Sequence, residues 1–281
     1  MADGCLNFDT NRNGEGFEKG LKSLSDMVGD IKPKLKSLAM ALTAAFSVKK
    51  LVDFGRQSIE TASDLAEVQN VVDTAFGESK QKMEDFADTA VKTYGISKLT
   101  AKQTGSNFMA MAAGMGLAND SASDMAMALT GLSADMASFY NVGQDVASTA
   151  LKSIFTGETE TLKQFGIVMT DANLQAYALS KGITKSTADM SQAEKVQLRY
   201  NYVMSQTALA QGDFAKTSDS WANQTRILSE QWKEFGATIG TVLMNVLLPA
   251  VKAINSLLSQ LIALAQGAAR SLSELSLIHI S

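Results

Sequence analysis

The chain has 281 residues and a net charge of −4, with 46% hydrophobic and 19% charged residues, which excludes a disordered tail and a chain made mostly of membrane spans. The acidic balance offers no electrostatic basis for binding nucleic acid, and the single Cys5 excludes an internal disulfide and a cysteine-based metal cluster. Because there are 14 Met and only 2 Pro, and Met favours helix whereas Pro breaks it, the composition predicts an all-α protein.

Residues 1–35 are predicted to form a glycine-rich turn and a first helix that begins near Phe17. A D-x-N-x-N-G phrase starts at Asp9 and matches the opening of a calcium-binding loop. The twelfth position of such a loop supplies a bidentate Glu, but that position holds Gly20 here. We therefore expect a turn at this place and no metal site.

Residues 36–60 are predicted to form an apolar helix flanked by lysines, within KSLAMALTAAFSVKK. Its uncharged part is shorter than the ~20 residues that span a bilayer, so it would lie in a core or at an interface. Ser47 and Lys50 match the S-x-x-K box of penicillin-recognising enzymes, but no S-D-N or K-T-G partner follows. A glycine-rich phosphate loop is also missing. The sequence thus predicts no catalytic residue, no cofactor and no enzyme.

Residues 61–215 are predicted to form a compact bundle of short helices. Glycine can end a helix in the left-handed conformation, and the next apolar residue then packs back on the last turn. Ser191 and Glu194 have the spacing of a capping box. The predicted glycine stops are Gly95-Ile96, Gly166-Ile167 and Gly182-Ile183. Helical spacing of apolar residues predicts that the core contains Phe86, Val91, Leu129, Met136, Phe139, Phe165, Leu174, Tyr177 and Tyr200.

Residues 216–274 are predicted to form a long, apolar, coiled-coil-like helical segment, with a kink or a break at Pro249. Its pattern positions recur alternately four and three apart, with Thr225 between Trp221 and Leu228, which is the a/d pattern of helices that pack side by side. We call the apolar ones the apolar seam: Trp221, Leu228, Trp232, Phe235, Ile239, Val242 and Val246. An exposed apolar surface of this kind marks a site of interaction. We expect it to be buried against other copies of this chain, in preference to a membrane.

Several long phrases carry a family resemblance. FDTNRNGEGFEKGLKSL, AAFSVKKLVDFGRQSIETASDLAEVQNVVDTAFG and GETETLKQFGIVMTDANLQAYALSKGITK resemble bacteriophage tail tape measure proteins, in which an F-D-T phrase precedes a G-F-x-K-G-L helix. The resemblance extends from about Asn7 to the 240s.

This resemblance implies a structural protein of the virion tail that acts as a length ruler while the tail tube polymerises. It also implies tail-tube and tail-assembly chaperone partners, a stay in the host cytoplasm during assembly, and help for genome passage through the host envelope. A helix rises 1.5 Å per residue, so residue count converts directly into length.

The final LSLIHIS, residues 275–281, holds the only histidine, His279. The phrase resembles a sequencing-library adapter translated in frame, so we expect these residues to be an artefact and the gene to continue beyond them. His279 is accordingly not expected to belong to a site.

Two other functional classes remain open at this point. The first is a membrane-active helical protein, pore-forming or lytic, which would use the lysine-flanked helix and the apolar segment on a host membrane. The second is a helical enzyme, for which the sequence offers no recognisable constellation.

Overall fold

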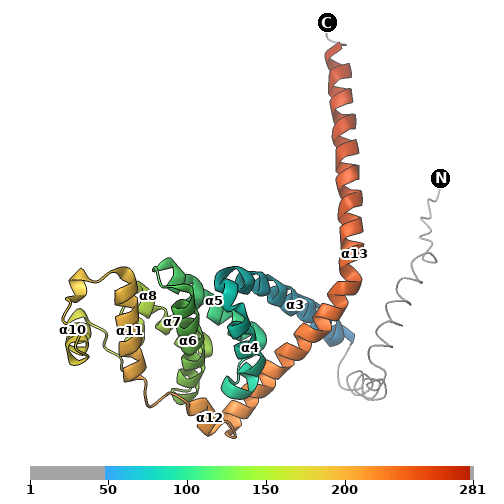
Figure 1. The fold of residues 1–281 in the computed structure, drawn as a ribbon. Coiled ribbons are helices and arrows are strands. Elements are labelled where there is room, and N and C mark those ends of the chain that lie inside the picture. The colour runs from blue at the N-terminus through green and yellow to red at the C-terminus, as the bar shows by residue number, and fades with distance from the viewer. Residues whose placement is uncertain (1–47, 279–281) are drawn as a thin grey trace. The chain divides into compact units, whose positions relative to one another are not determined.

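The structure is a computed structural model that describes residues 48–278, apart from some side chains near the two ends of this range. Every regular element in this range is a helix (Figure 1), so the all-α prediction is confirmed for the described part of the chain. In chain order the elements are α3 (Val48–Phe76), η2 (Gly77–Ser79), α4 (Lys80–Tyr94), α5 (Lys98–Gly114), α6 (Asn119–Phe139), α7 (Gln144–Leu151), α8 (Ser153–Thr156), α9 (Glu160–Lys163), α10 (Asp171–Ser180), η3 (Thr187–Asp189), α11 (Gln192–Gln206), α12 (Asp213–Thr217) and α13 (Trp221–Ile278).

The chain divides into two compact units. Glu60–Ala237 form the larger one, and the described residues on either side, 48–59 and 238–278, belong to the other. The first turns of α13 are therefore part of the larger unit. The turn at Asp9, Ser47 of the S-x-x-K match and His279 lie outside the described residues.

Helix α6 occupies the centre of the larger unit and packs against α4, α5, α7 and α12. All residues from Leu129 to Ala137 are buried. Gly131 permits the closest approach, since a Cβ at this position would lie 2.8 Å from Cζ of Tyr94. A larger residue would push α4 away from α6, which explains a glycine in the middle of a helix despite its poor helix propensity.

The predicted glycine stops are confirmed. The three glycines have positive φ angles of 65°, 74° and 77°, which L residues with a side chain rarely adopt. The N–H groups of Ile167 and Ile183 donate to the carbonyl five residues earlier, as in a Schellman motif. Ile96 and Ile167 are buried, whereas Ile183 is exposed, so the third stop gains little from apolar packing.

The predicted capping box at the start of α11 is also confirmed. Ser191 Oγ accepts a hydrogen bond from the N–H of Glu194, and a carboxylate oxygen of Glu194 accepts one from the N–H of Ser191 at 2.7 Å. Lys185 pairs with the same carboxylate at 2.8 Å. The bonds from Lys185 and from Ser191 hold the pKa of Glu194 at about 2.

The predicted core needs one correction, because Phe139 is 44% exposed. Phe139 is the last residue of α6, and the next residue, Tyr140, takes the interior position instead. The Tyr140 ring lies 5.0 Å from that of Phe165, and its hydroxyl donates to the Phe165 carbonyl. The other predicted core residues are buried or half-buried: Phe86, Val91, Leu129, Met136, Phe165, Leu174, Tyr177 and Tyr200.

Candidate functional site

The first turns of α13 present a polar face to the helical bundle. Asn223 and Glu230 are 3% and 9% exposed, and Arg226 and Glu234 are half-buried on the same face. The four residues are spaced three and four apart, which places them along one side of the helix. Their hydrogen bonds reach the ends of two other helices, α5 and α6.

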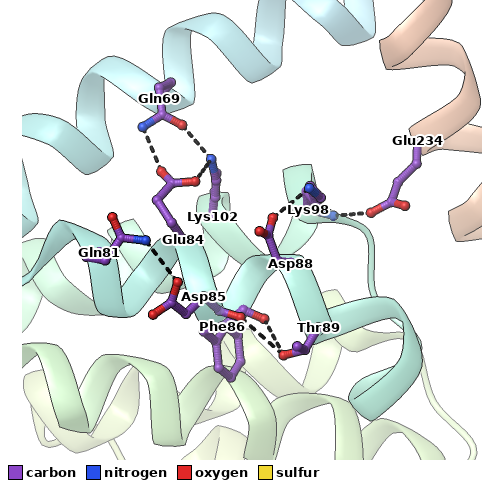
Figure 2. A network of polar contacts seen from close by, with 10 residues as sticks. All are labelled: Gln69, Gln81, Glu84, Asp85, Phe86, Asp88, Thr89, Lys98, Lys102 and Glu234. Carbon is purple, nitrogen blue, oxygen red and sulfur yellow. Dashed lines mark hydrogen bonds and ion pairs between the residues drawn. The ribbon is translucent and has the colours of Figure 1, made fainter.

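Two carboxylates from α13 cap the start of α5. The N–H of Ser97 donates to Glu230 Oε2 at 3.0 Å. The N–H of Lys98 donates to Glu234 Oε1 at 2.9 Å, as Figure 2 shows. The first N–H groups of a helix have no partner within it, and the helix dipole makes this end positive. Carboxylates are therefore well suited to this position.

The charge of Glu230 is stabilised although the residue is buried. Burial raises the pKa of Glu230, but the hydrogen bonds from Lys233 and from Ser97 together lower it by more than burial raises it. The pKa therefore lies below the ordinary value for Glu. The Thr100 hydroxyl also donates to Glu230 Oε2, at 3.1 Å. At neutral pH this carboxylate is ionised and holds α13 to the start of α5.

Arg226 and Asn223, one to two turns earlier on α13, contact the end of α6. Arg226 Nη2 donates to the carbonyls of Ala137 and Val142, at 3.4 and 3.3 Å. Asn223 Nδ2 donates to Ser138 Oγ at 3.0 Å. A cation near the last carbonyls of a helix interacts favourably with the helix dipole. Helix α13 thus places two carboxylates at the start of α5 and a guanidinium at the end of α6.

Asp135 fixes the chain immediately before α13. Its carboxylate accepts the N–H groups of Gly212 at 2.8 Å and of Phe214 at 3.2 Å, at the start of α12. Burial raises the pKa of Asp135, against the lowering effect of these two bonds. Phe214 in turn packs against Gly95, where a Cβ would lie 2.4 Å from the ring.

Figure 2 also shows a charged cluster that ties α3, α4 and α5 together. Lys102 is 6% exposed and pairs with Glu84 at 2.6 Å, while Gln69 bonds both residues. Lys98 pairs with Asp88 at 2.6 Å. The polar groups of this cluster are paired with one another, so it serves the packing of the helices and offers no reactive group.

The predicted apolar seam lies on α13, and its first part is turned away from the polar face. Trp221, Leu228 and Trp232 are 85%, 64% and 46% exposed. Phe235 lies with its ring 5.6 Å from that of Trp232, and it is half-buried, as are Ile239 and Val242. The side chain of Val246 is outside the described set. Pairing of the seam with another helix of a second copy stays a prediction.

Beyond residue 238 helix α13 continues to Ile278 and exposes further apolar side chains. Pro249 lies inside α13, so of the two predicted outcomes, a kink or a break, the break is wrong and the kink stays a prediction. Proline removes a single hydrogen bond of the helix, and the turns on both sides persist. The exposed apolar residues of this part include Leu248, Val251, Leu258 and Ile262.

Sequence reasoning missed the polar face of α13, since attention to the apolar pattern left Asn223, Arg226, Glu230 and Glu234 unassigned. Their regular spacing was a signal, but their partners on α5 and α6 lie far away in the sequence. Glu230 and Ser97 are 133 residues apart. Only the folded chain brings these groups together.

The described residues, 48–278, contain neither a membrane-spanning helix nor a metal-binding cluster. No helix in this range is long and apolar enough to cross a membrane. No group of acidic, histidine or cysteine side chains among the described residues has the arrangement of a metal site. The feature that stands out is thus a helix with a polar face on the bundle and an apolar stripe outside.

No protein-family model matches the chain, and neither a curated protein nor a solved structure matches it. The likeness to tail tape measure proteins consequently rests on the sequence phrases alone.

Proposed function

We propose that this chain is a structural protein of a bacteriophage tail that sets tail length during assembly, with other copies of itself, tail-tube proteins and assembly chaperones as partners. Assistance to genome passage through the host envelope is an additional proposed role. The observation that carries the proposal is α13, a helix of 58 residues. At 1.5 Å per residue, it has a contour length of roughly 87 Å.

A ruler needs a regular conversion of residues into distance, and a continuous helix provides it. It also needs lateral contacts, because an isolated helix in water is only marginally stable and gains most of its stability from packing an apolar face. Trp221 and Leu228 expose such a face. The bundle uses the opposite, polar face, so α13 can pair with a second copy without leaving the bundle.

The length function is tested by deleting 28 residues, 243–270, in frame from the gene in the phage that carries it. Four complete heptads leave the a/d register intact. The tail should shorten by about 42 Å in electron micrographs, and an insertion of 28 heptad-matched residues should lengthen it equally. Viable phage with tails of unchanged length in both cases would contradict the proposal.

The association is tested on the full chain by changing Trp232 and Ile239 together to Asp. Two charges in an apolar contact are costly, so the variant should remain monomeric in sedimentation velocity while the wild type associates. The bundle should keep its helicity, because neither residue belongs to the polar face by which α13 contacts it. Strong insertion of the wild type into liposomes, with no association in solution, would favour the membrane-active alternative instead.

A further inference from the structure

A hollow of about 380 Å³ opens where α6, α12 and the start of α13 meet. All of its lining belongs to the larger unit. Phe139 and Asn141 contribute one wall, Asp213 comes from α12, and Ala222 and Arg226 come from α13. Hollows of roughly 300–1,000 Å³ hold small organic groups in many proteins, so a bulky side chain fits into this one.

Trp221 is a large apolar group directly beside this hollow. It precedes Ala222 at the start of α13, yet it does not line the hollow and is 85% exposed. A tryptophan buries some 150–250 Å² in a typical contact, and its ring dominates the energetics of interfaces. The exposed indole of Trp221 therefore has apolar surface that a second molecule can bury.

The chemistry of the hollow suits an indole ring. Arg226 makes no ion pair among the described residues, its Nη1 has no hydrogen-bond partner, and burial lowers its pKa. A guanidinium is attracted to the face of a tryptophan ring. The exposed ring of Phe139 offers edge or offset stacking, and Asp213 and Asn141 offer oxygen acceptors to the indole N–H, which can only donate.

We propose that Trp221 of one copy inserts into this hollow on a second copy of the chain, forming a two-fold dimer. A two-fold interface is made of the same patch on both subunits, so projection and hollow must be neighbours on one surface. Trp221 and Ala222 are consecutive residues in the first turn of α13, so the projection and the hollow lie within one turn of the same helix. The inference rests on the self-association in the proposed function and gives it a defined contact.

The test uses the full chain and two complementary variants, both checked for unchanged helicity and melting temperature. Trp221→Ala removes the projection and keeps the hollow. Ala222→Phe keeps the projection and fills the hollow. Each variant alone should dimerise at least about 30-fold more weakly in sedimentation velocity, since buried interface tryptophans are typical hot spots.

Mixing the two variants distinguishes the proposed contact from nonspecific hydrophobic association. The mixed dimer regains one of the two contacts, because Trp221 of the Ala222→Phe chain can enter the open hollow of the other chain. We expect the mixture to dimerise more tightly than either variant alone. Leu209→Ala is the matched control, since Leu209 is 82% exposed and lies outside the hollow; it should dimerise like the wild type.

Two further measurements keep the proposal testable if Ala222→Phe disturbs the fold. Phe139→Ala removes one wall of the hollow and should also weaken the dimer. In a Trp232→Phe chain, Trp221 is the single tryptophan, and its emission should shift to shorter wavelength as the dimer forms.

Three results would overturn the insertion. Dimerisation unaffected by Trp221→Ala, but abolished by Asp at 232 and 239, would leave the seam association intact and remove the proposed contact. Weakening by Trp221→Ala without weakening by Ala222→Phe would place the indole elsewhere. A wild type that stays monomeric at the highest reachable concentration would contradict both the insertion and the self-association.

Discussion

Replacing Glu230 with Ala tests how α13 is held to the bundle. Ser97 is 1% exposed, so loss of the carboxylate leaves its N–H without an acceptor in a place that water hardly reaches. A buried unsatisfied donor costs about 1–3 kcal/mol, and a carboxylate at a partly buried helix start contributes up to about 2 kcal/mol through the dipole. We expect the free energy of unfolding to fall by about 2–4 kcal/mol at pH 7.

Glu230→Gln separates the two contributions, because the amide oxygen still accepts a hydrogen bond but the charge is lost. It should cost less than the Ala variant. Glu158→Ala, which removes an exposed carboxylate, is the control and should stay within about 0.5 kcal/mol of the wild type. Urea unfolding followed by circular dichroism at 222 nm measures all four proteins, with equal m values as the condition for comparing them.

The effect should depend on pH in a defined direction. The pKa of Glu230 is lowered in the folded protein, so its charge contributes fully above the unfolded value of about 4.3. This contribution is lost as the pH falls through the folded pKa. The difference between wild type and Glu230→Gln should therefore shrink below about pH 4. A loss below about 1 kcal/mol for the Ala variant at pH 7 would refute the role assigned to this carboxylate.

Two further substitutions test the packing of the bundle. Gly131→Ala should destabilise the protein by about 1–3 kcal/mol, because its methyl group meets the Tyr94 ring; Gly114→Ala, with open space around it, should be neutral or slightly stabilising in the same urea titration. Leu129→Ala should cost about 2–5 kcal/mol as a fully buried residue, whereas Phe139→Ala should cost under about 1 kcal/mol; equal losses would contradict the exposure of Phe139.

Features that depend on a few neighbouring residues were predictable from the sequence. The capping box joins Ser191 to Glu194, and the stop at Gly166 joins Ile167 to a carbonyl five residues earlier. These bonds form within one helical turn, so residue type and spacing determine them before any tertiary contact exists. The all-α class was also predictable from the sequence, because helix-favouring composition and helical spacing of apolar residues do not depend on tertiary contacts.

The direction in which each helix faces was decided only by the tertiary structure. Helical spacing placed Phe139 in the core, but at the end of α6 the chain turns and Tyr140 fills that position. The apolar stripe of α13 predicted a surface that packs, yet the bundle binds the polar face through Glu230 and Arg226. Both outcomes depend on the ends of helices far away in sequence, where unpaired N–H and C=O groups need partners that local spacing cannot reveal.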